Sequence, residues 1–404
     1  MIPFSPPRID DKTIASVTEA LKSGWISTGP KTRLFEQQLA TYLGTDEVVC
    51  LNSATAGLQL ILHWLGIGEG DEVIVPAYTY TASVNVIVHT GATPVLVDVR
   101  REDFNIDPEK VREAITEKTK AIIAVDIGGF PADYNELFGI VNNNAIKAKF
   151  KPGTDVQSAI GRIMVIADAA HSIGARYHDD YTGKQADMSS FSFHAVKNLT
   201  TAEGGAVVFN VSQWFNHSEL KSKFKTSSLH GQNKDAFSKV QIGGWRYDVL
   251  EAGFKCNMTD LQAAIGLVEL ERYEDTLQRR RDIFRNYSEA LSSYEWAIIP
   301  NYISKYKCTS YHLYMLRIKG INETTRDKII DEIGKNGVAV NVHYIPIPML
   351  TFYKNLGYRI ADYPVCYELF QNEISLPVYY NLTDEQVQTV VTTLVNAVNN
   401  VLNE

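Results

Sequence analysis

The first half of the chain alternates between two hydrophobic patterns. Residues 32–43 and 54–67 repeat apolar positions at helical spacing. Between them lie short runs of nearly continuous β-branched residues bounded by turn signals, at 72–76, 94–99, 120–126, 163–169 and 205–210. Strands of this kind that alternate with helices predict an α/β fold whose mainly parallel sheet is flanked by helices on both faces. In such sheets ligands bind beyond the carboxyl ends of the strands.

The second half has a different pattern and predicts a smaller α+β domain. A long helical pattern occupies residues 260–291, and strands are expected near 310–318 and 338–344 before a closing helix that starts after Asp384. We therefore predict a large domain at 1–258 and a small C-terminal domain at 259–404. The stretch 142–158 is rich in Asn, Lys, Pro and Gly, and it predicts an inserted surface loop.

Composition narrows the possible functions. The 404 residues are 45% hydrophobic and carry a formal net charge of −8, which argues against nucleic-acid binding because that needs clustered basic residues. The chain has no apolar run of membrane-spanning length, and its first residues lack a signal-peptide pattern, so we expect a cytoplasmic protein without membrane contact. Neither a disulfide framework nor a metal site is expected from four widely spaced cysteines.

The candidate chemistry centres on Lys197, in the segment SFSFHAVKNLTTAEGG at residues 190–205. A lysine there is either an ordinary side chain that reaches water along an apolar surface or an amine held out of water for reaction. Asp168 ends an expected strand, where it could face a ligand or cap the next segment. His171 follows three residues later and would share a face with Asp168 on a helical turn, although a lone histidine is commonly a core residue.

Two further segments suggest a phosphate and an aromatic ring. NSATAG, at residues 52–57, begins a predicted helix, whose first N–H groups favour a phosphate; the alternative is simple capping by Ser53 or Thr55. Tyr78 and Tyr80 follow the strand at 72–76, where they could pack in the core or lie against a flat cofactor. Pyridoxal 5'-phosphate (PLP) uses a lysine, an acid, a phosphate site and an aromatic plate together.

Most of the chain resembles the DegT/DnrJ/EryC1/StrS family of PLP-dependent sugar aminotransferases, which have the fold-type-I aminotransferase fold. The segment S-F-H-x-x-K-N-L-T-T-x-E-G-G is the strongest match, and the other matching stretches are residues 25–45, 52–62, 70–99, 166–175, 257–266 and 342–350. The resemblance implies that Lys197 binds the cofactor aldehyde and transfers protons. It also implies that Asp168 pairs with the ring nitrogen, that His171 lies near the ring hydroxyl and that Tyr80 stacks on the ring.

The same resemblance implies the remaining contacts and partners. Ala54, Thr55 and Ser192 would hold the phosphate, together with Asn257 from a second subunit of a homodimer with shared active sites. Because Ser192 and Lys197 are an odd number of residues apart, the chain must bend between them if both serve one pocket. The expected substrates are L-glutamate as amino donor and a keto sugar nucleotide as acceptor, in aminosugar or polysaccharide biosynthesis. Residues resembling those that line the sugar site are Thr28, His312, His343 and Tyr344.

Three alternatives remain at this point. A nicotinamide oxidoreductase is suggested by Gly66, Gly68 and Gly70, but this G-x-G-x-G precedes a strand instead of joining a strand to a helix. Related sugar dehydratases also use PLP, although a histidine replaces the lysine in them, so Lys197 favours amino transfer. A non-catalytic protein that senses a sugar or cofactor is the third alternative.

Overall fold

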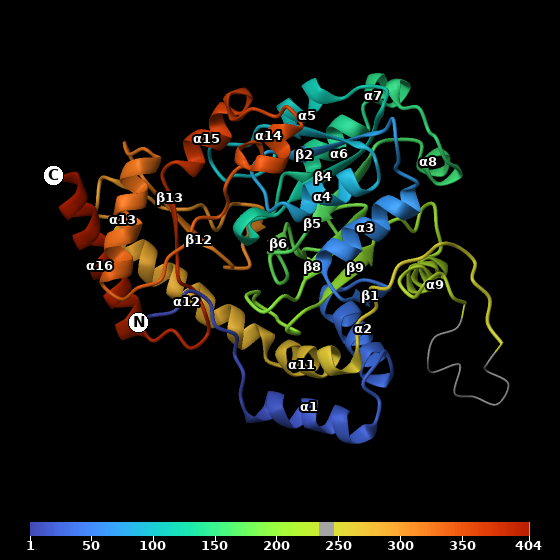
Figure 1. Cartoon of the computed structure of the whole chain (residues 1–404), viewed down its shortest axis with the longest axis horizontal. Coiled ribbons are helices and arrows are strands. Elements are labelled where there is room, and N and C mark those ends of the chain that lie inside the picture. Colours follow the sequence, from blue (N-terminus) through green and yellow to red (C-terminus); the bar gives the residue numbers. More distant parts are fainter. Residues whose placement is uncertain (234–245, 404) are drawn as a thin grey trace.

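Seven strands form the central sheet of this computed structural model, which describes residues 1–233 and 246–403 (Figure 1). β9 is antiparallel to both of its neighbours, and the pairs β8·β5, β5·β4, β4·β2 and β2·β3 are parallel. The predicted α/β fold with a mainly parallel sheet is confirmed. The strands, in spatial order, are β1 (Val48–Leu51), β9 (Gly205–Phe209), β8 (Met188–Ser192), β5 (Met164–Asp168), β4 (Thr119–Val125), β2 (Glu72–Pro76) and β3 (Thr93–Val97).

Helices cover both faces of this sheet, as the apolar strands require. Successive strand residues point to opposite faces, so Val73 and Val75 join one apolar core while Ile74 joins another. The first core includes α3 (Ala54–Leu65) and α4 (Ala82–His89). Helices contributing to the second core are α2 (Pro30–Leu43), α5 (Pro108–Ala114), α6 (Tyr134–Val141) and α11 (Asp260–Glu271).

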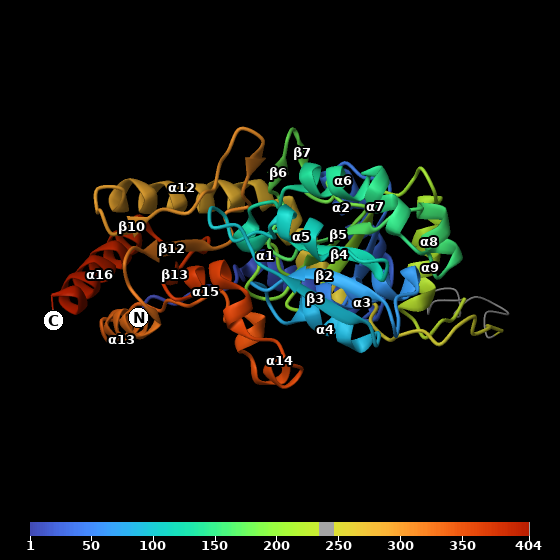
Figure 2. The same cartoon turned by 90° about the horizontal axis from the view of Figure 1, so that it is seen from above.

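The C-terminal part has its own core around a small antiparallel sheet. Its strands are β10 (Ala297–Ile298), β12 (Tyr314–Ile318) and β13 (Glu373–Leu376). The covering helices are α12 (Tyr273–Leu291), α13 (Glu323–Lys335) and α16 (Asp384–Leu402), and both chain termini lie at this end of the molecule (Figure 2). The strand predicted at 338–344 is wrong: those residues form only isolated pairings, Val338 with Ile2 and Asn341 with Ser375.

Shorter elements complete the described chain. The prediction of a loop at 142–158 is also wrong in part. This stretch contains two short helices, which Asn143 and Thr154 cap with their side chains. Gln157 then ties the second of these helices to the end of α3 by donating to the Leu65 carbonyl over 3.0 Å. The remaining elements are α1 (Asp11–Ser23), α7 (Asn144–Lys149), α8 (Asp155–Ile160), α9 (His217–Ser227), α14 (Thr351–Asn355), α15 (Pro364–Phe370), β6 (Arg176–Tyr177), β7 (Asp180–Tyr181) and β11 (Lys307–Cys308).

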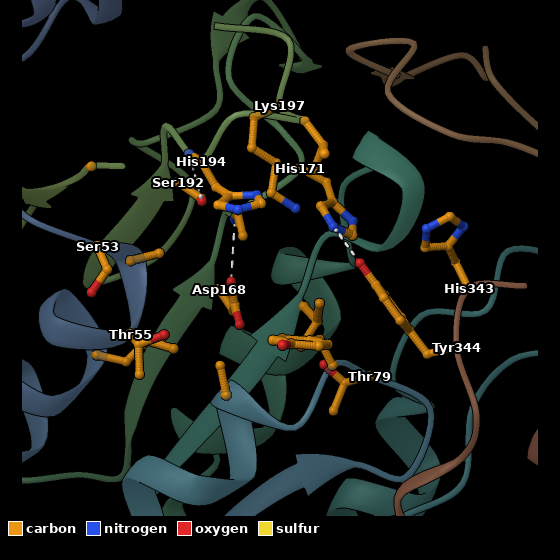
Figure 3. Close-up of a pocket in the computed structure, with 18 of the residues that line it drawn as sticks. Ser53, Thr55, Thr79, Asp168, His171, Ser192, His194, Lys197, His343 and Tyr344 are labelled. Carbon is orange, nitrogen blue, oxygen red and sulfur yellow. Dashed lines mark hydrogen bonds between the residues drawn. The ribbon is translucent and has the colours of Figure 1, made fainter. Parts of the chain in front are cut away.

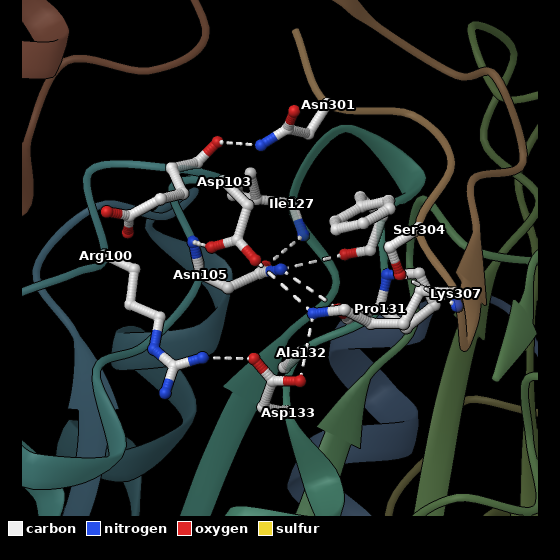
Figure 4. A network of polar contacts seen from close by, with 12 residues as sticks. Arg100, Asp103, Asn105, Ile127, Pro131, Ala132, Asp133, Asn301, Ser304 and Lys307 are labelled. Carbon is white, nitrogen blue, oxygen red and sulfur yellow. Dashed lines mark hydrogen bonds and ion pairs between the residues drawn. The ribbon is translucent and has the colours of Figure 1, made fainter. Parts of the chain in front are cut away.

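A polar network joins a late segment of the chain to the edge of the large sheet (Figure 4). Lys307, on β11, has a largely buried side chain that pairs with Asp103 at 3.4 Å and Asp133 at 3.1 Å. Asn105 donates to the carbonyl oxygens of Phe130 and Pro131, and it accepts from the Ile127 N–H at 3.1 Å. The network therefore holds residues 127–133, which pass close to the cavity described below.

The predicted domain boundary near residue 258 lies just before α11. That helix packs on α1 and α2, whereas α12 continues into the C-terminal part and packs against α16 (Figure 1). The boundary itself stays a prediction. In the part of the chain that the structure describes, no helix is both long and apolar enough to cross a membrane.

Candidate active site

A cavity of about 470 Å³ opens where β2, β4 and β5 end, at the edge of the sheet expected to bind a ligand (Figure 3). Its volume lies in the range of small-molecule sites. The structure brings together at this cavity nine of the residues proposed from the sequence: Ala54, Thr55, Tyr80, Asp168, His171, Ser192, Lys197, His343 and Tyr344. Tyr80 lies at the rim, where its side chain is largely exposed and its ring is 5.6 Å from that of Tyr344.

Lys197 reaches the cavity because the chain turns sharply after β8. The Lys197 N–H donates to the His194 carbonyl over 2.9 Å, so the strand direction is lost between Ser192 and Lys197, and both residues line the same cavity. This bend is the one that their odd spacing predicts. Desolvation lowers the pKa of the Lys197 amine to about 8, although the nearby Asp168 carboxylate opposes that shift. The neutral amine is therefore far more populated near neutral pH than it is in an ordinary lysine, although the charged form still dominates.

Asp168 is the last residue of β5 and is buried. Its Oδ2 accepts from the Ser83 hydroxyl at 2.7 Å, and its Oδ1 accepts from the Ala170 N–H at 3.2 Å. Desolvation raises the pKa of Asp168, whereas these two hydrogen bonds and the charge of Lys197 lower it. Since Ser83 gives its proton to the carboxylate, it accepts one from the Thr79 hydroxyl 2.9 Å away. Sequence reasoning missed Ser83 and Thr79, although both lie in the segment that was examined for its tyrosines.

His171 lies in a turn after β5 and is buried. Its Nδ1 is 3.2 Å from the Gly128 N–H, which can only donate, so in the neutral ring the proton sits on Nε2. Nε2 is 2.9 Å from the Tyr344 hydroxyl and donates to its oxygen, which leaves the hydroxyl proton of Tyr344 for a ligand. Desolvation and the charge of Lys197 hold the pKa of His171 well below its usual range. The ring is therefore neutral at physiological pH.

The N-terminus of α3 forms the opposite wall of the cavity. Ser53 caps the helix by accepting from the Ala56 N–H, while Ala54 and Thr55 line the cavity at the first turn. The first N–H groups of a helix have no partners within it and attract anions. A Cβ atom at Gly205 would lie 2.4 Å from the Ala54 nitrogen, so β9 approaches this turn as closely as only glycine allows. The two interpretations of this segment are therefore compatible: Ser53 caps the helix, and the first turn at Ala54 and Thr55 remains available to an anion.

The other three proposed residues do not line this cavity in the single chain. His312 is buried behind it, where its Nδ1 is 2.9 Å from Asn198 Oδ1, and it borders a small adjoining pocket with Lys197. Asn257 donates to the Thr28 hydroxyl over 2.6 Å, and Thr28 in turn donates to the Met258 carbonyl. Asn257 and Thr28 therefore belong to a separate polar cluster, next to the start of α11.

The fold and this cavity define a class: an α/β protein of the fold-type-I aminotransferase kind, with a lysine and a carboxylate at the ends of neighbouring strands. Within residues 1–233 and 246–403, no group of three or more His, Cys, Asp or Glu side chains is arranged to hold a metal ion.

Comparisons with known proteins identify the family. The sequence profile of the DegT/DnrJ/EryC1/StrS aminotransferase family matches residues 7–150 and 154–395. The chain is 36% identical to the spore coat polysaccharide biosynthesis protein SpsC of Bacillus subtilis, over 96% of this chain and 95% of that protein. The chain belongs to the DegT/DnrJ/EryC1/StrS aminotransferase family, whose aminotransferases depend on PLP.

Solved structures of similar fold support the same family assignment. Spr1654 of Streptococcus pneumoniae, assigned as a sugar aminotransferase, superposes in its PMP form with a TM-score of 0.96 at 46% identity, covering 99% of this chain and 100% of that one. Its PLP form gives a TM-score of 0.95. Helicobacter pylori PseC, an aminotransferase involved in pseudoaminic acid biosynthesis, gives a TM-score of 0.85 at 28% identity, covering 99% of both chains.

Proposed function

We propose that this protein transfers an amino group from L-glutamate to a keto group of a nucleotide-linked sugar, with PLP as cofactor and Lys197 as the catalytic residue. The observation that carries the proposal is the meeting of Lys197, Asp168 and the α3 N-terminus at one cavity. A sugar dehydratase of the related kind has a histidine in place of the lysine, and a protein that only senses a sugar has no need of an amine with a lowered pKa.

The residues fit PLP in charge and position. The α3 N-terminus with Thr55 and Ser192 would hold the phosphate, and the close approach of Gly205 leaves that turn open to an anion. Asp168, whose charged form is favoured by hydrogen bonds from Ser83 and the Ala170 N–H, would pair with the ring nitrogen. Tyr80 and His171 would lie against the ring and its hydroxyl. When bound, PLP supplies an aldehyde that receives the amino group and a protonated ring that withdraws electrons from the reacting carbon.

Lys197 is suited to bind the cofactor and then to move a proton. A neutral amine is the nucleophilic form, and the pKa of about 8 keeps part of the Lys197 population neutral at physiological pH. Once an amino donor has displaced it, the same amine serves as a base and then as an acid beside the substrate carbon. The neutral His171 and the Tyr344 hydroxyl next to it orient ligand groups without adding charge.

The nucleotide sugar and glutamate are the finer parts of the proposal. PseC acts in pseudoaminic acid biosynthesis, and SpsC acts in spore coat polysaccharide biosynthesis, so two relatives work on sugar-derived products. The wall formed by His343 and Tyr344 presents polar side chains that suit a hydroxyl-rich acceptor. For glutamate the support is the family resemblance alone.

A homodimer with shared active sites is the proposed assembly. Thr28 and Asn257 lie outside the cavity of their own chain, so Thr28 can reach a sugar and Asn257 a cofactor only in the active site of a second subunit. Apolar side chains on α1 and the segment after it are more than half exposed, at Ile14, Leu21 and Ile26. A partner subunit that covers this surface would remove its apolar area from water. Light scattering of the purified protein tests the proposal, because a monomer that turns over at full rate would contradict it.

An absorption experiment tests cofactor, reaction and donor together. Glutamate added to the PLP-loaded protein should convert the cofactor to pyridoxamine phosphate and release 2-oxoglutarate, which mass spectrometry detects. Aspartate and alanine serve as alternative donors. Lys197→Ala should abolish conversion and the borohydride-trapped bond between cofactor and protein, whereas Lys184→Ala, an exposed lysine paired with Asp180, should behave as wild type. A trapped bond on any other lysine contradicts the assignment.

A further inference from the structure

A buried carboxyl group is connected to the cavity by a chain of hydrogen bonds. Glu373, on β13, is fully buried, and its Oε1 accepts from the Ser375 hydroxyl at 2.5 Å. The Ser375 oxygen is also 2.9 Å from Nδ1 of His343, whose ring lines the cavity (Figure 3). Glu373 Oε2 accepts from the His343 backbone N–H at 3.0 Å, which fixes the two residues relative to each other.

The protonation state of Glu373 sets the tautomer of His343. Ser375 has one proton to give, and an ionised Glu373 can only accept, so Ser375 donates to Glu373 and must accept from the Nδ1–H of a neutral His343. Nε2 of His343 then carries a lone pair. If Glu373 is protonated, it donates to Ser375, Ser375 donates to Nδ1, and the proton of the ring moves to Nε2. Each state makes the same hydrogen bonds in the opposite direction.

We propose that Glu373, Ser375 and His343 form a proton relay that exchanges one proton between a ligand in the active-site cavity and the buried carboxyl group. In the forward direction Nε2 of His343 takes a proton from a ligand ammonium or hydroxyl. The Nδ1 proton passes to Ser375, and the Ser375 proton passes to Glu373. One N–H or O–H bond forms for each that breaks, and the negative charge moves from Glu373 to the ligand side. His343 is neutral before and after the exchange.

The surrounding charges suit such a relay. Burial and the positive charge of Lys197 lower the pKa of His343 to about 3, so the ring does not hold a proton as an imidazolium at physiological pH. Burial raises the pKa of Glu373 to about 8, so the carboxyl takes and returns a proton near neutrality. His171 and His312 are also within electrostatic range of His343, and the Tyr344 ring lies 5.0 Å from its ring.

Few charges face the carboxyl of Glu373. Ser375 and the His343 N–H lower its pKa through hydrogen bonds, and Arg326 lowers it through its charge. Arg326 directs its donors to the Phe370 carbonyl at 2.8 Å and to Asp327 at 2.6 Å. Among the described residues, Tyr78 and Tyr344 are also within electrostatic range of this carboxyl, and burial raises the pKa of both phenols, so they stay neutral. The carboxyl group therefore remains an acid that titrates near pH 8.

The assignment of the ligand as an amino donor or sugar rests on the proposed function, but the relay itself can be tested without either substrate. We would label histidine with ¹⁵N in the PLP-loaded protein and follow the His343 ring nitrogens by NMR, assigned by their loss in His343→Gln. Above about pH 8 the proton should sit on Nδ1, and below it on Nε2, following the titration of Glu373. Glu373→Gln and Ser375→Ala should abolish the switch, whereas Ser375→Thr, which keeps a hydroxyl, should retain it.

Kinetics give the second readout. Ser375→Ala should slow the reaction of the loaded protein with its amino donor by about tenfold or more and flatten its pH profile near pH 8, since general acid–base catalysis contributes about 10²- to 10⁴-fold. Ser375→Thr should stay close to wild type. If Ser375→Ala does not fold, the nearly isosteric Glu373→Gln provides the same test. A single His343 tautomer throughout the titration in wild type, or a switch that survives Ser375→Ala, overturns the relay.

The two proposals fail separately. A tautomer switch in a protein that does not react with glutamate would contradict the proposed function and leave the relay standing. Reaction with glutamate and an unchanging His343 tautomer would contradict the relay alone.

Discussion

Replacing Ser83 with alanine tests how the cavity keeps Asp168 ionised. Ser83 is fully buried, and its hydroxyl donates to Asp168 over 2.7 Å. Burial raises the pKa of the Asp168 carboxyl because the charged form loses its hydration, and the Ser83 hydrogen bond opposes that effect. In Ser83→Ala the neutral acid therefore persists to higher pH, and the acid side of the activity profile should move upward in pH.

The size of the effect follows from the kind of bond that is lost. A hydrogen bond to a charged group contributes about 1.5–3 kcal/mol. At about 1.4 kcal/mol per factor of ten, the step that depends on ionised Asp168 should slow by up to about 10- to 150-fold at pH values below the raised pKa of the variant, and by less above it. The Ala170 N–H and Lys197 still favour the charged form, so activity should fall without being abolished.

The assay is the single-turnover conversion of bound PLP by glutamate, measured at pH values between about 6 and about 9. Ser189→Ala is the matched control, because that buried serine on β8 donates to the Gly183 carbonyl at 3.3 Å and does not contact Asp168. It should react as wild type does. If Ser83→Ala and Ser189→Ala give the same rate and pH profile, Ser83 does not support the charge of Asp168, and the reasoning is refuted.

Three further predictions follow from the same geometry. Gly205→Ala should weaken PLP binding by about 1–3 kcal/mol through overpacking, because its Cβ would lie 2.4 Å from the backbone that opens α3; Gly139→Ala, which meets no atom within 4 Å, should bind PLP normally in a titration. Capture of PLP by cofactor-free protein, followed by stopped-flow absorbance, should speed up with pH and level off above about pH 8, where the Lys197 amine is neutral; a rate independent of pH would count against Lys197. Asp187→Ala should destabilise the fold by about 3–5 kcal/mol in denaturant unfolding, because it leaves the charge of buried Arg162 without the carboxylate that accepts two 2.8 Å hydrogen bonds; an unchanged midpoint would contradict this.

Local patterns in the sequence were sufficient for the sheet and for much of the cavity. Runs such as 72–76 and 163–169 are apolar on both faces, which only a covered parallel sheet satisfies, and strand ends then bring Asp168 and the segment around Tyr80 to one edge. The odd spacing of Ser192 and Lys197 correctly required a bend. These features depend on residues close together in the chain.

Errors and omissions arose where distant residues decide the structure. Residues 338–344 alternate like a strand, yet they find only single pairing partners, in Ile2 and Ser375. Glu373 and Ser375 meet His343 through that same distant pairing, so no local pattern marks them as neighbours of the cavity. The helices within 142–158 are a different kind of error, since their capping residues, Asn143 and Thr154, were visible in the sequence.

The hydrogen bonds of three histidines near Lys197 explain how the cavity wall is matched to its proposed ligands. His171 carries its proton on Nε2, because Nδ1 accepts from a backbone N–H. His312 carries its proton on Nδ1, because Asn198 directs its NH₂ group to a carbonyl and its Oδ1 to the ring. His343 does the same while its relay carboxyl is ionised. Burial and the charge of Lys197 keep all three rings neutral. His312, behind the cavity, therefore keeps an Nε2 lone pair, and His343, on the cavity wall, has one while Glu373 is ionised. Such a lone pair accepts protons from ammonium and hydroxyl groups and gains nothing from an apolar ligand. A donor amino acid and a hydroxyl-rich sugar both present such groups, so the same His343 ring can serve both half-reactions while it stays neutral itself.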